Sequence, residues 1–110
     1  MRKLEQGDII WIDFDPQAGH EESKRRPALV VSGQEALALI KGLALICPIS
    51  SHSRPFPTHV CLDERTNTSG LILCEQVKAL DINARNGAII EKAPREIVEE
   101  VLNIIHSMLD

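Results

Sequence analysis

Two short polar segments, residues 24–26 and residues 50–54, carry side chains that can hold a phosphodiester. The first is a run of three cations, and the second combines three serines with a histidine and an arginine. Guanidinium groups donate paired N–H bonds to phosphate oxygens, and serine hydroxyls add further donors. If the flanking strands are neighbours in a sheet, the two segments meet and form a cationic, hydroxyl-rich cleft. The same residues also fit a plainer alternative, a solvated charged loop beside a serine-rich turn.

The charge of the chain is unevenly distributed. The 110 residues carry a formal net charge of −4 at pH 7, which argues against nucleic-acid binding because Lys and Arg drive that binding by displacing counterions. Residues 23–62, however, hold five basic residues and one acidic residue, a balance of +4, so the rest of the chain sums to −8. Both polar segments lie in this basic stretch, and a nucleic-acid ligand therefore stays open.

Five carboxylates within residues 8–22 raise the alternative of a hard-metal site. Mg²⁺ needs only one or two carboxylates and keeps several waters. Asp8, however, suits the start of a strand, and Asp15 precedes Pro16 in a turn, roles that need no metal. Residues 20–24 lack the second histidine of a His-Glu-x-x-His site, and the sequence has no glycine-rich phosphate loop. We expect neither a metal nor a cofactor.

Three cysteines, Cys47, Cys61 and Cys74, each lie in an apolar run. Their odd number argues against a disulfide framework, and spacings of 14 and 13 residues do not fit a zinc site. We predict buried, reduced thiols. Catalysis by a Cys/His pair is an alternative that the apolar surroundings disfavour, since they oppose thiolate formation.

The elements that must position the polar segments are mostly short strands. The apolar runs and their alternation predict a bent antiparallel sheet or small barrel. In the first strand, alternation places Ile10, Ile12 and Phe14 on one face and Ile9, Trp11 and Asp13 on the other. Loops are expected at residues 15–26 and 50–57, and a short helix at residues 34–41. The expected strands are 9–14, 27–32, 43–49, 58–62, 70–74 with its continuation at 75–80, and 87–91.

Residues 94–109 predict one strong amphipathic helix. Pro94 suits the first turn of a helix. Such a helix must pack against the sheet, and its stripe is wide enough for part of it to meet a second subunit. The apolar face consists of two adjacent columns, Ile97, Val101, Ile104 and Met108 beside Val98, Leu102, Ile105 and Leu109.

The length of the chain predicts a single domain spanning residues 1–110. No window approaches 18 uninterrupted apolar residues, so we expect no membrane span. No apolar stretch of signal-peptide length follows the basic pair near the start. We therefore expect a cytoplasmic protein.

Several motifs, taken together and in order, resemble the MazF/PemK family of toxin endoribonucleases. The resemblance covers nearly the whole chain and rests mainly on the opening Gly-Asp-strand-Asp-x-x-Pro and the later Arg-Pro-x-Leu-Val-Val. The matching stretches are residues 7–16 (GDIIWIDFDP), 19–21 (GHE), 26–32 (RPALVVS), 47–51 (CPISS), 58–60 (THV) and 73–78 (LCEQVK).

The resemblance implies a small, bent Src-homology-3-like barrel of the CcdB/MazF/PemK type with a C-terminal helix, assembled as a homodimer. It also implies a toxin that cleaves single-stranded RNA, generally mRNA, without metal. Attack by the ribose 2′-OH would leave a 2′,3′-cyclic phosphate and a free 5′-OH, inhibiting translation and growth. The implied partner is a cognate MazE/PemI-like antitoxin with an acidic, disordered C-terminal tail, and no membrane is involved.

The family's catalytic arginine falls on Arg26, and its partner hydroxyl, usually a threonine, falls on Ser50. Serine lacks the stiffening methyl group, so Ser51 stays open as the alternative hydroxyl. Glu21 matches a loop glutamate of the family's active site, and Glu21, His20 and His52 are candidate general bases. Phe56 is the expected stacking platform. The remaining expected RNA-binding residues are Lys24, Arg25, Ser51, His52 and Arg54, with Phe56.

Two other functions fit the same resemblance. One is a non-enzymatic toxin of the CcdB type, which poisons DNA gyrase through the end of its terminal helix. This chain ends Ile105-His106-Ser107-Met108-Leu109-Asp110 and lacks the terminal Trp-Gly-Ile of that family. The other is a catalytically silent relative that binds RNA or antitoxin without cutting.

Overall fold

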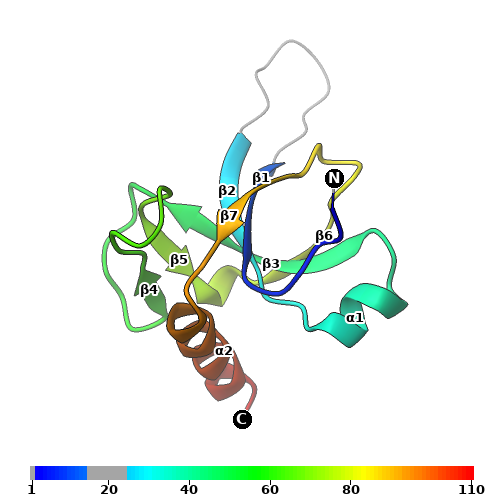
Figure 1. The fold of residues 1–110 in the computed structure, drawn as a ribbon. Helices are drawn as coiled ribbons and strands as arrows, with labels where there is room; N and C mark the ends of the chain where they lie inside the picture. Colours follow the sequence, from blue (N-terminus) through cyan, green and yellow to red (C-terminus); the bar gives the residue numbers. More distant parts are fainter. Residues whose placement is uncertain (1, 15–24) are drawn as a thin grey trace.

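The computed structural model describes residues 2–14 and 25–110, whose elements are arranged as in Figure 1. None of the helices in these ranges is long and apolar enough to cross a membrane. In order along the described chain, the elements are β1 (Asp8–Asp13), β2 (Arg25–Val30), α1 (Gln34–Leu39), β3 (Leu43–Ser50), β4 (His59–Cys61), β5 (Leu71–Leu73), the 3₁₀ turn η1 (Cys74–Gln76), β6 (Lys78–Asp81), β7 (Ala88–Lys92) and α2 (Arg95–Leu109).

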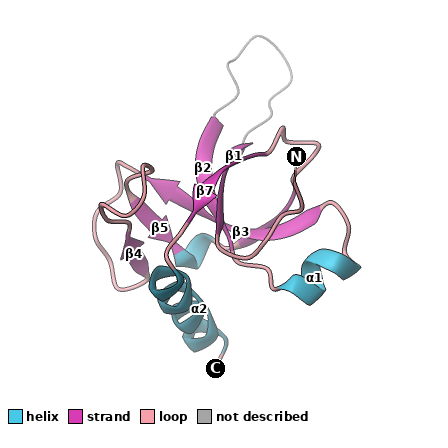
Figure 2. Cartoon of the chain, in the orientation of Figure 1, coloured by secondary structure: helices cyan, strands magenta, loops and turns pink. Residues whose placement is uncertain are grey.

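The strands form an antiparallel sheet centred on β3, the long strand in Figure 2. The strand order is β4-β5-β3-β2-β1-β7, and β6 also pairs with β3. The first half of β3 pairs with β6 and its last two residues pair with β5, so the sheet changes partners along this strand. The predicted antiparallel sheet with a C-terminal helix is confirmed. The predicted barrel is not closed, because no pairing among the described residues joins β4 to β7.

Alternation along the central strands gives the sheet two apolar faces. Ile9 and Leu29 are fully buried on the face that packs against α2. Ile10, Ile12 and Val30 are fully buried on the opposite face, where they pack with residues of β3 and β6. Burial of such a side chain contributes about 1.5–3 kcal/mol before ordering costs. The predicted assignment of Ile9 and Ile10 to opposite faces is therefore confirmed.

β2 begins two residues earlier than the sequence predicts. Arg25 and Arg26 pair with Asp13 and Ile12 of β1, so a strand holds both arginines where a loop was expected. Pro27, the expected first residue of the strand, is its third residue. The antiparallel ladder with β1 extends the strand to Arg25, which places both cations on rigid backbone.

The strand predicted at residues 75–80 is wrong in its first half. The 3₁₀ turn η1 follows β5, and the strand resumes only at Lys78. Two backbone bonds support this turn, from Cys74 N to the Thr58 carbonyl at 3.1 Å and from Val77 N to the Cys74 carbonyl at 3.2 Å. The turn carries the chain from β5, at one end of β3, to β6 at the other end.

The helix α2 packs against the sheet with only part of its apolar stripe. Ile97, Val98 and Val101 in its first half are buried, as predicted. Near its end, Met108 is 40% exposed and Leu109 is 78% exposed. The sheet of this chain therefore covers the first turns of the helix and leaves the apolar C-terminal end open.

Candidate functional site

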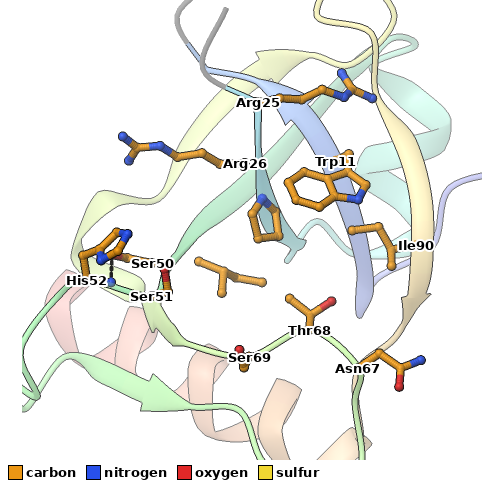
Figure 3. A pocket seen from close by; sticks show the side chains of 12 residues that line it. Trp11, Arg25, Arg26, Ser50, Ser51, His52, Asn67, Thr68, Ser69 and Ile90 are labelled. Carbon is orange, nitrogen blue, oxygen red and sulfur yellow. Dashed lines mark hydrogen bonds between the residues drawn. The ribbon is translucent and has the colours of Figure 1, made fainter.

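The end of β3 lies beside the start of β2, as the sequence predicts for its two polar segments. Antiparallel pairing sets Ala28 opposite Pro48, so residues 25–26 and 50–52 come from adjacent strand ends. A pocket of about 720 Å³ opens between them, completed by side chains of β1 and β7 and by residues 67–69 (Figure 3). Residues from both segments thus line one pocket, as the cleft hypothesis predicts.

Two arginines extend to opposite sides of this pocket (Figure 3). Arg25 is tied down, because its Nη1 donates to Asp13 Oδ1 at 3.2 Å, and Asn86 Nδ2 donates to Asp13 Oδ2 at 2.9 Å. Arg26 is exposed and extends toward the side on which His52 lies. No hydrogen bond or ion pair to another described residue holds the Arg26 guanidinium, so its donors are available to a ligand.

The hydroxyl oxygen of Ser50 is a hydrogen-bond acceptor for the turn that follows β3. It accepts bonds from the backbone N–H of His52 at 3.1 Å, from that of Ser53 at 3.1 Å and from the Ser53 hydroxyl at 2.9 Å. These bonds fix the side chain, and no described residue accepts a hydrogen bond from the Ser50 O–H. Ser51 also lines the pocket but is exposed and lacks this support from described neighbours.

Trp11 of β1 forms the apolar floor of the pocket. The residue is 42% exposed, and its indole faces the pocket beneath Arg25 (Figure 3). The residues opposite it on the neighbouring strands are Pro27 and Ala88. Both are small, so neither reaches across the ring. The large aromatic surface consequently stays open to solvent on a strand whose neighbouring residues are buried.

A β-bulge in β7 adds a second apolar side chain to the floor. Ile9 pairs with Glu91, but Ile10 pairs with Ile89, so Ile90 is an extra residue in the ladder. Such a bulge bends its strand and changes the direction of a side chain. The side chain of Ile90 lines the pocket beside Trp11 (Figure 3).

Residues 67–69 form one lip of the pocket, and Glu91 holds them in place. Its carboxylate accepts bonds from Asn67 N at 3.0 Å, from Thr68 N at 2.7 Å and from the Thr68 hydroxyl at 2.7 Å. These bonds outweigh the effect of desolvation and lower the pKa of Glu91. The next residue, Gly70, has a φ of +128°, and a Cβ there would lie 2.6 Å from the Ser50 carbonyl oxygen. Glycine therefore lets the lip approach the end of β3 closely.

The structure brings together five of the nine residues that the sequence assigns to the site. Arg54 and Phe56 are exposed on the following loop but do not line the pocket. Glu21 and Lys24 lie outside the described residues, as does the alternative base His20. The five residues that line the pocket are Arg25, Arg26, Ser50, Ser51 and His52.

Sequence reasoning missed the floor and the lip. Trp11 alternates with buried isoleucines, and its exposure depends on the small residues that pairing places opposite it. The bulge at Ile90 cannot be recognised from the alternation of apolar and polar residues in the sequence. Residues 67–69 look like an ordinary polar turn, and only the bonds to Glu91 place them at the pocket.

The carboxylates that raised the metal alternative have other partners where they are described. Asp8 accepts a bidentate bond from Arg2 at 2.8 and 3.2 Å and lies 3.1 Å from Lys92 Nζ. Asp13 is bound to Arg25 and Asn86. Within residues 2–14 and 25–110, no group of three or more His, Cys, Asp or Glu side chains is placed to hold a metal.

The cysteines are free thiols, and two of them are buried as predicted. Burial raises the pKa of Cys47 to about 12 and that of Cys74 to about 11. Cys61, also predicted to be buried, is exposed at the end of β4. The high pKa values make Cys47 and Cys74 poor nucleophiles at neutral pH.

Comparison with known proteins places the whole chain in one family. A family profile described as a PemK-like, MazF-like toxin of type II toxin-antitoxin systems matches residues 5–109. Endoribonuclease PemK of Escherichia coli is 33% identical over 110 aligned residues, covering 96% of this chain and 82% of the relative. The endoribonuclease toxin ChpB of Escherichia coli K12 is 34% identical over 116 aligned residues, covering 98% and 96% respectively.

The fold is similar to that of solved structures over almost its whole length. A MazE–MazF crystal structure (Form-II) from Deinococcus radiodurans has a TM-score of 0.88 and 33% identity, covering 99% of this chain and 97% of the other. MazF alone (Form-I) from the same organism has a TM-score of 0.85 and 33% identity, with 99% and 98% covered.

Proposed function

This chain belongs to the PemK-like, MazF-like family of type II toxins, and we propose that it is an endoribonuclease that cleaves single-stranded RNA in the Arg26–Ser50 pocket. The observation that carries the proposal is the convergence, in an open pocket, of a fixed serine hydroxyl and a guanidinium that no other described residue binds. The curated relatives compared above are named endoribonucleases. The gyrase-poisoning alternative is not favoured, since no relative named above supports it.

The proposed reaction is attack of a ribose 2′-OH on the adjacent phosphorus. The P–O5′ bond breaks, and the leaving 5′ oxygen takes a proton from water, so that the products are a 2′,3′-cyclic phosphate and a 5′-OH and no metal takes part. Guanidinium stays protonated in proteins, so Arg26 stabilises the charge of the pentacovalent phosphorane instead of removing a proton. The Ser50 O–H donates to the same phosphate, because its oxygen lone pairs are already engaged by the turn.

A general base must take the 2′-OH proton. Glu21 and His20 are candidates outside the described residues, and His52 is the candidate that lines the pocket. Glu21 keeps the catalytic role that the resemblance implies. Varying each of the three residues, with the pH dependence of cleavage as the readout, distinguishes them: removal of the base abolishes one limb of the profile.

The proposed RNA path extends beyond the pocket. Arg25 and Ser51 contact phosphate groups at the rim of the pocket. His52 follows Ser51, at the start of the next loop. Arg54 and Phe56 on that loop contact the strand farther along, as does Lys24. Support for this path comes from the exposure of the described residues and from the basic balance of residues 23–62.

We also propose that residues 1–110 form a single toxin domain, related to Src-homology-3-like barrels, and that it acts in the cytoplasm as a homodimer. The exposed apolar end of α2 supports self-association. The cognate antitoxin is a MazE/PemI-like protein whose acidic, disordered tail occupies the basic RNA groove. The relatives solved as MazE–MazF complexes support an antitoxin partner.

The ends of the cleavage products test this proposal. Purified protein is incubated with single-stranded RNA in EDTA, and the fragment ends are identified by their susceptibility to kinase and phosphatase. The expected fragments carry a 2′,3′-cyclic phosphate and a 5′-OH. Intact RNA, with saturable RNA binding, would instead indicate a silent relative. Intact RNA with stalled gyrase would support the CcdB-type alternative.

A further inference from the structure

We propose that the floor of the pocket is a nucleobase site, in which one unpaired base of the bound RNA stacks on Trp11. This inference rests on the proposed function and adds to it the residue that holds a base beside the reacting phosphate. The ligand class is therefore a base next to the cleaved bond, and not only a phosphate chain.

The exposure of Trp11 is the first observation that carries the proposal. Trp11 is 42% exposed as a residue, whereas its neighbours Ile10 and Ile12 on the same strand are fully buried. Pro27 and Ala88, directly opposite on the two adjacent strands, are too small to cover it. An aromatic face left open in a pocket offers a stacking surface to any base, because every base has a π face.

The position of the ring relative to the charged groups is the second observation. Arg25 lies above the indole, Arg26 extends away from it toward the side of His52, and Ser50 lies at the far edge of the same pocket (Figure 3). Ile90, displaced by the bulge, extends the apolar floor beside the ring. An apolar floor under a cationic rim matches a nucleotide, whose base is flat and apolar on its faces and whose phosphate is anionic.

The lip supplies groups that can read the edge of the base. The backbone N–H groups of residues 67 and 68 and the Thr68 hydroxyl already bind Glu91. The side chains of Asn67 and Ser69 are exposed and line the pocket. A carboxamide both donates and accepts, and can therefore pair with the edge of a base. The lip thus determines which base is preferred, while Trp11 binds bases of any kind.

The two phenylalanines are less well placed. Phe56 is 62% exposed but packs at a tilt against His59, with ring centroids 5.8 Å apart, and does not line the pocket. Phe14 packs against the second apolar face, and Lys78 Nζ lies 5.0 Å from its ring centroid. The chain has one tryptophan, two phenylalanines and no tyrosine. Of these aromatic residues, all within the described ranges, Trp11 alone faces the pocket.

The fluorescence of the protein tests the proposal directly, since Trp11 is its sole tryptophan and tyrosine is absent. The probe is a ten-nucleotide 2′-O-methyl RNA of randomised sequence, in which the blocked 2′ oxygen prevents attack. A fully abasic chain of the same length serves as the control. Saturable quenching by the first and none by the second is the expected result. Equal quenching by both, or none by either at saturation, would overturn the stacking site.

Substitution separates this inference from the proposed function. Trp11→Ala should raise KM for RNA about 5- to 150-fold, the equivalent of one stacked base, with little change in kcat. Trp11→Phe should recover most of that loss, and Leu39→Ala, which removes an exposed side chain outside the pocket, should change neither constant. If RNA is cut and Trp11→Ala keeps the wild-type KM, only the base site is wrong. If wild-type protein leaves RNA intact, the proposed function is wrong, and the fluorescence result still decides the base site.

Discussion

Hydrogen bonds from the turn after β3 hold the side-chain oxygen of Ser50, the residue that we propose donates to the phosphate. Three bonds from residues 52 and 53 hold it as an acceptor, and no described residue uses its proton. The methyl group that a threonine would provide is absent, and these bonds supply the stiffness instead. Under the proposed function, Ser50 can therefore take the place of the threonine that the family resemblance implies.

Ser50→Ala should lower the cleavage rate about 10²- to 10³-fold, the range for loss of a transition-state donor. Ser50→Thr keeps the hydroxyl and should cleave at close to the wild-type rate. Ser51→Ala should cost less than Ser50→Ala, because it removes only a rim contact. Single-turnover rates on one RNA measure all three. A larger loss for Ser51→Ala than for Ser50→Ala would exchange their roles.

The cysteines allow a prediction about reactivity. At pH 7–8 a thiol whose pKa is about 11 or 12 is almost entirely protonated, and only the thiolate attacks disulfide reagents. We expect one fast-reacting thiol, Cys61, in the native protein and three after unfolding. Labelling by an aromatic disulfide, followed by mass spectrometry, identifies the site. Fast modification of Cys47 in folded protein would contradict its burial.

At the scale of single residues, the sequence predicts the residues that we propose for phosphate binding, but not the surface that we propose for the base. Arg26 and Ser50 stand out by their types and their neighbours in the chain, and both line the pocket. Trp11 is as visible in the sequence, but its exposure depends on Pro27 and Ala88, which are distant in sequence and opposite in the sheet. The register of strand pairing decides which side chains lie opposite Trp11 and so whether its ring stays exposed. The alternation of apolar residues alone does not determine that register.

At the scale of elements, the close approach of β5 to the end of β3 shapes the pocket. Ser50 pairs with Leu71 of β5, and Gly70, the residue before Leu71, lies against the Ser50 carbonyl. The apolar runs predicted both strands. The turn η1 is not predicted because neither glycine nor proline marks it in the sequence, and the backbone bond to Thr58 that stabilises it joins distant segments.

Gly70→Ala should destabilise the protein by about 1–3 kcal/mol and lower RNA cleavage, because its φ of +128° and the 2.6 Å approach to Ser50 O both exclude a Cβ. Gly42→Ala is the matched control, since its φ is +86° and a Cβ at that position would meet no atom within 4 Å beyond its chain neighbours. Urea unfolding gives the free energy of both variants. Equal losses would mean that left-handed backbone alone, and not the contact with Ser50, accounts for the cost.

At the scale of the whole molecule, an ion cluster joins the N-terminal segment to β7. The buried Asp8 carboxylate binds Arg2, Lys92 and the backbone N–H of Glu5. Burial alone would raise the pKa of Asp8, but these three bonds outweigh it and hold the pKa below its ordinary value. The stabilisation from this lowered pKa is present at neutral pH and is lost as pH falls below about 4 and through the folded-state pKa.

Asp8→Asn should therefore cost about 1–2 kcal/mol at pH 7, a modest value because Arg2 and Lys92 are half exposed. The difference from wild type should shrink as pH falls below about 4, the ordinary pKa of an aspartate, and through the lower folded-state pKa of Asp8. Urea unfolding at a series of pH values measures it. A difference that stays constant with pH would contradict the ionic role of Asp8.

The overall architecture was predictable where it depends on local pattern. Strand spacing and the amphipathic C-terminal segment predict an antiparallel sheet with one long helix, which the structure confirms. Closure into a barrel depends on pairing between β4 and β7, and nothing in the alternation of either strand encodes its partner. The uneven charge was also readable from the sequence: net charge describes the whole chain, whereas both arginines of the pocket lie in its basic part, residues 23–62.

The rate of RNA cleavage by Arg26→Ala tests the central claim most directly. Wild type and variant are compared in EDTA on one single-stranded RNA, with circular dichroism to show that both are folded. Arg26 is exposed on its strand, so the fold should survive the change. The predicted result is a rate about 10²- to 10⁴-fold lower, with no change in the fragments formed. An unchanged rate would contradict the assignment of catalysis to the Arg26–Ser50 pocket.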